Sequence, residues 1–153
     1  MKIYLAAPLF TQAECKWNRE LAEALRMCDP RCEIVLPQDA ASDAVENGVP
    51  NFRRVFDICL HGIFQSDLVV AILDGSDSDS GTCFECGYAF ASGKPVLGVR
   101  TDVRASEDRG LNAMLSQSCV DVVYFPSTNE SVHQLAEAIV KKLKEVVGRV
   151  GGS

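Results

Sequence analysis

An acidic loop, a glycine turn and a glutamate, close together in the chain, are the strongest chemical signal in this sequence. The apolar segment 68–73 is a predicted strand, and the loop after it contains Asp79 and Gly81. A helix predicted over residues 82–92 follows, with Glu85 in its first turn, where the helix dipole favours an ionised carboxylate. Such a carboxylate is the group that attacks the C1′ carbon of a sugar in covalent glycosyl transfer.

Glu85 also fits a purely structural role. The spacing Thr82-x-x-Glu85 is that of a capping box, in which the glutamate side chain accepts a hydrogen bond from the backbone amide of the capping threonine. Because such boxes are common at helix starts, the spacing alone leaves both interpretations open.

The acidic loop itself contains Asp74, Asp77 and Asp79. Three carboxylates could bind Ca²⁺, but the loop lacks the glycine and glutamate positions of an EF-hand. The segment from Asp77 to Asp79 also matches the short D-x-D pattern of metal-dependent glycosyltransferases, which is too short to decide a function. We interpret Asp77 and Ser78 as a solvated turn. Asp79, just before the Gly81 turn, is expected to face the pocket.

The seven cysteines include the pair Cys83-x-x-Cys86, a spacing found in redox and zinc sites. Zinc requires a second pair, and Cys28 and Cys32 are predicted far away at the end of the first helix. A redox pair usually follows the first strand of a thioredoxin-like unit, and this one does not. We interpret the cysteines as reduced thiols, mostly packed in the core, and we expect neither a metal nor a cofactor.

Strands and helices alternate along the sequence. The predicted strands are residues 2–6, 33–36, 68–73, 95–99 and 120–125. The predicted helices are residues 12–28, 51–65, 82–92, 111–117 and 130–147. We interpret residues 38–50 as a small polar loop. This alternation predicts an α/β, flavodoxin-like (Rossmann-like) three-layer sandwich whose five parallel strands have the order 2-1-3-4-5.

In that strand order the chain reverses direction between the first and third strands, and ligands bind at that point beyond the carboxyl ends of the strands. The loops that meet there are residues 7–10 and 74–81. Glu85 is therefore expected to lie opposite Phe10 in the crevice, with Tyr4 near its floor. The first of these loops lacks the glycine-rich patterns that cradle phosphates, which favours a neutral or weakly charged ligand.

Composition and charge narrow the class of protein. The 153 residues predict one domain over residues 1–150 with a frayed tail at 151–153. With 47% hydrophobic and 24% charged residues the chain is typical of a globular protein, and its net charge of −6 argues against nucleic acid or anionic membranes as partners. No apolar stretch is long enough to span a membrane, and the run at 3–10 is too short for a usual signal peptide. We expect a cytoplasmic protein.

Five motifs occur in an order that resembles a known family. They are KIYLAAPLF at 2–10, DLVVAILDG at 67–75, D-x-G-T-x-x-E-x-G-x-A at 79–89, GKPV at 93–96 and GLNAML at 110–115. Together they resemble the nucleoside 2-deoxyribosyltransferase family over roughly residues 2–125. Each motif falls where the flavodoxin-like fold requires it.

The resemblance implies an enzyme, a glycosyltransferase that exchanges the base of a 2′-deoxyribonucleoside with retention of configuration, in nucleoside salvage. The glutamate that matches Glu85 attacks C1′ and forms a covalent deoxyribosyl ester, which a second base or water then resolves. By position, Tyr4 holds Glu85 through its hydroxyl, and Asp79 contacts the substrate and assists proton transfer at the base.

The resemblance also implies substrate-binding residues outside this trio. Phe10 is expected to pack on the plane of the base, Gln38 falls near a base-contacting glutamine, and Gly81 belongs to the same binding surface. Asn112 and Met114 match residues that reach into the site of a neighbouring subunit and meet the 5′ end of the sugar. We therefore expect a homodimer or larger homo-oligomer with shared active sites.

One position departs from the family pattern. Many members have an aspartate or asparagine three residues before the glycine that matches Gly62, and this chain has Cys59 there. Asp57 is close in sequence but lies half a turn away, so a regular helix points it elsewhere. A thiol is a poor proton shuttle, which leaves open the identity of the leaving-group acid and the preference for purine or pyrimidine.

Three other functions are weighed against the transferase. A related branch hydrolyses deoxyribonucleoside 5′-monophosphates and tends to hold the phosphate with Ser and Arg after the first strand, whereas residues 7–10 here are apolar. A non-catalytic nucleoside-binding module would not need Tyr4, Asp79 and Glu85 together. A cysteine-based metal or redox protein is the third alternative.

Overall fold

The computed structural model describes residues 1–41, 44–46, 48–104 and 110–150. Five parallel strands form its main sheet. In spatial order they are β2 (Glu33–Val35), β1 (Lys2–Ala6), β5 (Leu68–Ile72), β6 (Val96–Arg100) and β7 (Asp121–Tyr124). Counting only these strands along the chain, the order is 2-1-3-4-5, so the predicted flavodoxin-like arrangement is confirmed.

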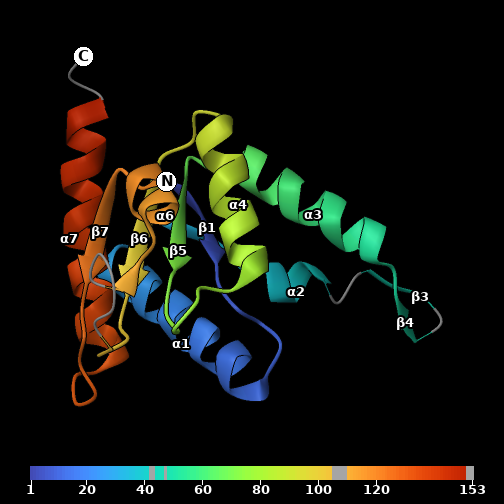
Figure 1. Cartoon of the computed structure of the whole chain (residues 1–153), viewed down its shortest axis with the longest axis horizontal. Coiled ribbons are helices and arrows are strands. Elements are labelled where there is room, and N and C mark those ends of the chain that lie inside the picture. Colours follow the sequence, from blue (N-terminus) through green and yellow to red (C-terminus); the bar gives the residue numbers. More distant parts are fainter. Residues whose placement is uncertain (42–43, 47, 105–109, 151–153) are drawn as a thin grey trace.

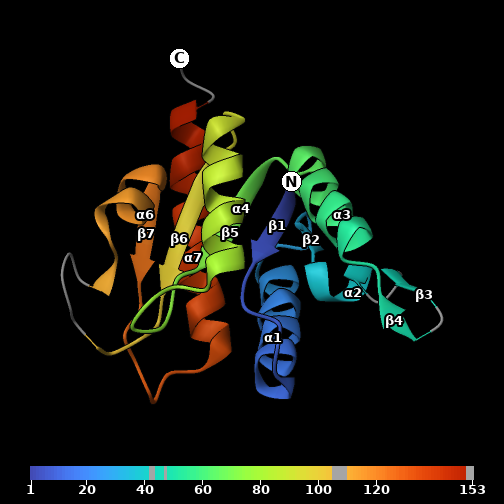
Figure 2. The same ribbon diagram turned by 45° about the vertical axis from the view of Figure 1, so that its right-hand side comes forward.

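Helices cover both faces of the sheet and give it the predicted three layers (Figure 1). One face packs against α1 (Gln12–Cys28) and α7 (Val132–Val150). The other face packs against α3 (Phe52–Gln65), α4 (Ser80–Ala91) and α6 (Ala113–Ser118). Figure 2 shows α4 in front of the strands and α7 behind them. None of the described helices is long and apolar enough to cross a membrane.

Successive side chains of β1 point to opposite faces of the sheet and so join the two cores in turn. Ile3 and Leu5 join the core under α1 and α7, whereas Tyr4 and Ala6 join the core under α3 and α4. All five residues of β5 are buried, as expected for a central parallel strand covered on both faces. The phenol of Tyr4 is therefore directed to the face of the sheet that carries α4.

The segment between β2 and α3 differs from the prediction, because residues 38–50 are not a simple loop. It begins with the short helix α2 (Pro37–Ala41), where proline occupies the first helical position that its fixed φ angle suits. The antiparallel strands β3 (Val45–Glu46) and β4 (Val49–Pro50) follow, and Gly48 supplies a φ of 79° beside them. Figure 1 shows this hairpin standing away from the main sheet.

Other boundaries agree with the sequence to within a few residues. The predicted capping box at the start of α1 is confirmed. The Thr11 hydroxyl accepts a hydrogen bond from the Glu14 amide at 3.2 Å, and the Glu14 carboxylate accepts one from the Thr11 amide at 2.8 Å. The predicted frayed tail at 151–153 lies outside the described residues.

Candidate active site

A cavity of about 370 Å³ opens beyond the carboxyl ends of β1 and β5, between α3 and the start of α4. Its size falls within the roughly 300–1,000 Å³ of small-molecule sites. Phe10 borders it from the loop after β1, Phe56 and Cys59 from α3, and Asp79 and Glu85 from the region where α4 begins. This is the crevice that the strand order predicts.

The start of α4 corrects the expected position of Glu85. Asp79, not Thr82, is the N-cap, because Asp79 Oδ2 accepts hydrogen bonds from the Thr82 amide at 2.8 Å and from the Thr82 hydroxyl at 3.0 Å. The helix therefore begins at Ser80, and Glu85 lies in its second turn. The predicted Thr82–Glu85 capping box is wrong, and the helix dipole, which acts over the first turn, contributes little to Glu85.

The Glu85 carboxylate is instead held by Tyr4. The Tyr4 hydroxyl donates a hydrogen bond to Glu85 Oε1 at 2.5 Å across 81 positions of sequence. Tyr4 is 1% exposed, and burial together with the charge of Glu85 raises the pKa of its phenol. The phenol consequently stays protonated and remains a donor to the carboxylate.

The environment of Glu85 adjusts its ionisation to the neutral range. Burial raises the pKa of Glu85 from 4.5 to about 7, and the nearby charge of Asp79 adds to the rise. Hydrogen bonds from Tyr4 and from Cys59 act in the opposite direction by stabilising the ionised form. Glu85 is thus a carboxylate of raised basicity that is still substantially ionised near neutral pH.

Cys59 and Asp57 lie where the helical spacing predicts. Cys59 faces the cavity beside Tyr4 and Glu85, and burial raises the pKa of its thiol, so it is a neutral group there. Asp57 points elsewhere and forms an ion pair with Arg53 at 3.1 Å. A Cβ atom at Gly62 would come within 2.9 Å of the Tyr4 ring, so a small residue is needed behind the tyrosine.

Only some of the remaining predicted binding residues border the cavity. Phe10, 76% exposed, and Gly81 border the cavity. Gln38 does not border it: Gln38 Oε1 accepts a hydrogen bond from Asn18 at 3.0 Å and Gln38 Nε2 donates one to the Cys15 carbonyl at 2.8 Å. A base contact by Gln38 therefore stays a prediction that requires these bonds to be exchanged.

Asn112 and Met114 lie away from Glu85 within the same chain. Asn112 Oδ1 caps α6 by accepting a hydrogen bond from the Leu115 amide at 3.0 Å, and the residue borders a separate hollow with Ser78. Met114 is 82% exposed. Neither side chain lines the cavity of its own chain.

Three phenylalanines of the cavity wall were not predicted from the sequence. Phe52 and Phe56 come from α3 and Phe84 from α4, and the rings of Phe56 and Phe84 are 5.8 Å apart. All three are exposed, at 78%, 42% and 53%. The signal that could have identified them is an aromatic side chain on the exposed side of a helix, since exposed apolar patches often mark binding sites.

Burial lowers the reactivity of the Cys83 and Cys86 thiols. Cys86 is completely buried, which raises the pKa of its thiol to about 12, and the pKa of Cys83 is also raised by burial. A reactive thiol requires the opposite shift. The described residues contain no group of three or more His, Cys, Asp or Glu side chains arranged to hold a metal ion.

Comparison with known families agrees with this geometry. The sequence profile of the family described as nucleoside 2-deoxyribosyltransferase matches residues 3–116, which is most of the chain. The chain belongs to this family. None of the curated proteins matches the sequence significantly.

Solved structures similar to this deoxyribosyltransferase family member include a conserved protein from Enterococcus faecalis, with 29% identity, a TM-score of 0.73 and coverage of 93% of this chain and 98% of the other. A 2-deoxyribosyltransferase from Bacillus psychrosaccharolyticus has 28% identity and a TM-score of 0.66, covering 89% and 90%. A CMP N-glycosidase from Clostridium botulinum has 19% identity and a TM-score of 0.60, covering 88% and 97%, and shares the fold.

The Tyr4–Glu85 contact in this family member predicts a change in pH dependence. An activity that requires the ionised Glu85 carboxylate should fall as pH decreases through about 7, because Glu85 then binds a proton. In Tyr4→Phe the ionised carboxylate loses its phenol donor, so the midpoint of this acid limb should rise by about 1–2 pH units. Turnover measured over about pH 5–9 tests this. Tyr88→Phe, which removes a hydroxyl from α4 away from the cavity, should keep the wild-type midpoint, and an unshifted midpoint in Tyr4→Phe would contradict the role of the contact.

Proposed function

We propose that this protein exchanges the base of 2′-deoxyribonucleosides through a covalent deoxyribosyl ester on Glu85, as a step in nucleoside salvage. One observation carries the proposal. A buried tyrosine holds the Glu85 carboxylate at the wall of a cavity that also contains Asp79 and is bordered by aromatic rings. A positioned carboxylate, a second carboxylate for proton transfer and flat apolar walls are what the two displacements need.

In the first displacement, Glu85 attacks C1′ with a lone pair of its carboxylate while the bond from C1′ to the base breaks. The base leaves with that bonding pair and takes up a proton. Asp79 is placed to supply or guide this proton. Its Oδ2 accepts the two hydrogen bonds from Thr82, whereas its Oδ1 accepts none from the described residues. The absence of a 2′-hydroxyl on the sugar makes the developing oxocarbenium ion easier to form.

In the second displacement, a ring nitrogen of the incoming base attacks C1′ and passes its proton to Asp79, which restores the proton given to the departing base. The ester bond to Glu85 breaks, and the carboxylate is regenerated. Each displacement inverts C1′, so the exchange retains configuration. The Tyr4 hydroxyl stays protonated throughout and holds the departing and returning carboxylate in one place.

The aromatic residues of the cavity provide a surface for a planar base. Phe10 borders it on one side and the Phe56–Phe84 pair on another. Aromatic rings bind flat heterocycles by stacking with little dependence on their hydrogen-bonding groups. Such walls suit an enzyme that must accept one base after releasing another.

The charges of the cavity favour a nucleoside over a nucleotide. Among the described residues, no lysine, arginine or histidine borders the cavity, whereas Asp79 and Glu85 both do. A 5′-phosphate would therefore meet two carboxylates and no cation. Residues 7–10, which would hold the phosphate in a nucleotide N-glycosidase, contribute Ala7, Leu9 and Phe10 to the wall.

The experiment that separates the two activities compares deoxyinosine plus adenine with dIMP alone. We expect deoxyadenosine to form from the nucleoside, and kcat/KM for release of hypoxanthine from dIMP to be lower by at least ~100-fold, since the cavity offers the phosphate no compensating charge. Products are followed by liquid chromatography. Base release from dIMP without any exchange on the nucleoside would overturn the proposed transfer in favour of the glycosidase.

We further propose that the active sites are shared in a homodimer or larger homo-oligomer. Asn112 and Met114 lie outside the cavity of their own chain, and Met114 is largely exposed. The cavity is open to solvent along its phenylalanine border, which a neighbouring subunit would cover. Closure of this kind excludes the water that would otherwise hydrolyse the ester.

A further inference from the structure

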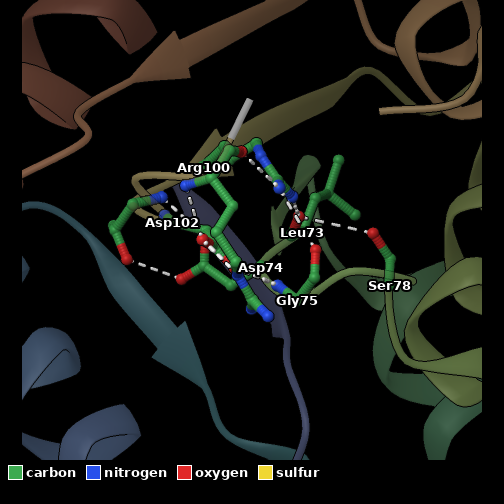
Figure 3. Close-up of polar contacts among 8 residues, drawn as sticks. Leu73, Asp74, Gly75, Ser78, Arg100 and Asp102 are labelled. Carbon is green, nitrogen blue, oxygen red and sulfur yellow. Dashed lines mark hydrogen bonds and ion pairs between the residues drawn. The ribbon is translucent and has the colours of Figure 1, made fainter. Parts of the chain in front are cut away.

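Arg100, at the end of β6, is a buried cation that takes no part in the proposed mechanism. It is 2% exposed, and its guanidinium lies under the loop that joins β5 to α4 (Figure 3). Arg100 Nη1 donates to the Leu73 carbonyl at 2.6 Å, and Nη2 donates to the carbonyls of Gly75 at 3.1 Å and Arg104 at 3.3 Å. We propose that Arg100 is a positioning residue that fixes this loop and, through it, Asp79 at the cavity.

The hydrogen-bond partners of Arg100 indicate that the shape of its guanidinium, and not only its charge, suits this position. Among the described residues no carboxylate forms an ion pair with it, and the acceptors of its hydrogen bonds are backbone carbonyls. Burying a cation in this way is costly, and its Nε is buried with no hydrogen-bond partner among the described residues, so the contacts that hold Arg100 are those of Nη1 and Nη2. A planar guanidinium can donate to several carbonyls at fixed angles, which an ammonium group cannot reproduce. A Cβ atom at Gly110 would overlap the guanidinium, so the backbone there is also fitted to it.

The carboxylates of Asp74 and Asp102 join the same two segments, but as hydrogen-bond acceptors where Arg100 is a donor. Asp74 Oδ1 accepts a hydrogen bond from the Thr101 amide and Oδ2 accepts one from the Thr101 hydroxyl, both at 2.6 Å. Asp102 Oδ2 accepts one from the Gly75 amide at 3.0 Å. The start of the β5–α4 loop is therefore attached to the segment after β6 through donors and acceptors on both sides (Figure 3).

The Leu73 carbonyl connects Arg100 to the catalytic end of the loop. It accepts a second hydrogen bond, from the Ser78 hydroxyl at 3.3 Å, so the first and last parts of the loop meet at one oxygen. The next residue, Asp79, caps α4 and borders the cavity. Removing the guanidinium should release Leu73 and Gly75 and let the loop, with Asp79, occupy several positions.

The first test is hydrogen exchange in Arg100→Met and Arg100→Lys. Amides over residues 74–83 should exchange at least ~10-fold faster in Arg100→Met than in the wild type. The exchange rate in Arg100→Lys should lie between the two, because lysine keeps the charge but lacks the planar guanidinium that donates to several carbonyls. Arg26→Met is the matched control, since Arg26 also donates to a backbone carbonyl, that of Ile34 at 3.1 Å, but is exposed on α1. It should leave exchange over 74–83 unchanged.

The second test asks whether Arg100 acts through Asp79, and here the inference rests on the proposed transferase activity. At a temperature where all variants are folded, Arg100→Met should lower kcat for base exchange by about 10–100-fold. In an Asp79→Asn background the same substitution should change kcat by no more than about twofold, because the residue it positions has lost its function. Equal fold losses in both backgrounds, or unchanged exchange over residues 74–83, would overturn the proposal.

The hydrogen-exchange test is independent of the proposed function. Hydrogen exchange needs no turnover, so it still decides whether Arg100 fixes the loop if the wild-type protein exchanges no base. In that event the proposed function is overturned. Faster exchange over residues 74–83 would then still support the loop contact, and unchanged exchange would refute it as well.

Discussion

Replacing Glu85 by glutamine is expected to lower the rate of base exchange by at least ~10⁴-fold, as removal of a covalent nucleophile does in other enzymes. Glutamine keeps the size of the side chain and an oxygen that can accept the Tyr4 hydrogen bond, but its amide cannot attack C1′. The measurement is kcat for conversion of deoxyinosine and adenine to deoxyadenosine. Turnover within about tenfold of wild type would exclude Glu85 as the nucleophile.

The stability of this variant is the control for correct folding, and it should move in the opposite direction from activity. The pKa of Glu85 is about 7 in the folded protein against 4.5 for the free side chain, so its protonated form stabilises the fold below pH 4.5 and this stabilisation is lost as pH rises through 7. Glu85→Gln removes that loss. Its Tm should exceed the wild-type Tm at about pH 8 and match it at about pH 4.

The second largest effect is expected from Asp79→Asn. If Asp79 assists proton transfer to the leaving base, kcat should fall by about 10²–10⁴-fold. Asparagine retains an oxygen that accepts the hydrogen bond from Thr82, so the cap of α4 is kept and the Tm should change little. The loss should be smaller for substrates whose bases leave more easily.

Asp77→Asn is the matched control for this prediction. This substitution removes the same charge from the same loop, but Asp77 is exposed and does not border the cavity. It should retain activity within about threefold of wild type. Equal losses in the two variants would indicate a general effect of loop charge and would contradict a specific role for Asp79.

Much of the fold follows from the sequence pattern, and the family resemblance implied the contact between Tyr4 and Glu85. Parallel strands that are buried on both faces give continuous apolar runs, such as residues 68–72, and the alternation with helices then restricts the strand order. Because side chains alternate along a strand, Tyr4 must face one layer or the other. The rule that loops at the carboxyl ends of parallel strands share one edge brings the acidic loop to the same place.

The start of α4 shows where local signals compete. Asp79 and Thr82 both have side chains that cap helices, and the sequence pattern Thr82-x-x-Glu85 favoured the later start. The outcome depends on tertiary contacts: Tyr4 binds the Glu85 carboxylate from another element, so Glu85 is not available to return to the helix start. A single local pattern could not reveal this.

Side-chain interactions outside the cavity were also beyond the sequence. Gln38 has both ends of its amide bound by groups of α1, a pairing that depends on the packing of α2 rather than on any motif. Arg100 follows the strand predicted at residues 95–99, and in the structure it is the last residue of β6 and almost fully buried. Charge alone predicts exposure, and only the carbonyls gathered around the guanidinium make its burial intelligible.

The covalent ester is the central claim, and intact-protein and peptide mass spectrometry test it most directly. The protein is mixed with a 2′-deoxyribonucleoside, quenched in acid within the turnover time and digested. We expect the mass of one deoxyribosyl group on the peptide that contains Glu85, absent in Glu85→Gln and discharged by added adenine with formation of deoxyadenosine. Base exchange by the wild-type protein with no such adduct, or an adduct that persists in Glu85→Gln, would contradict the account.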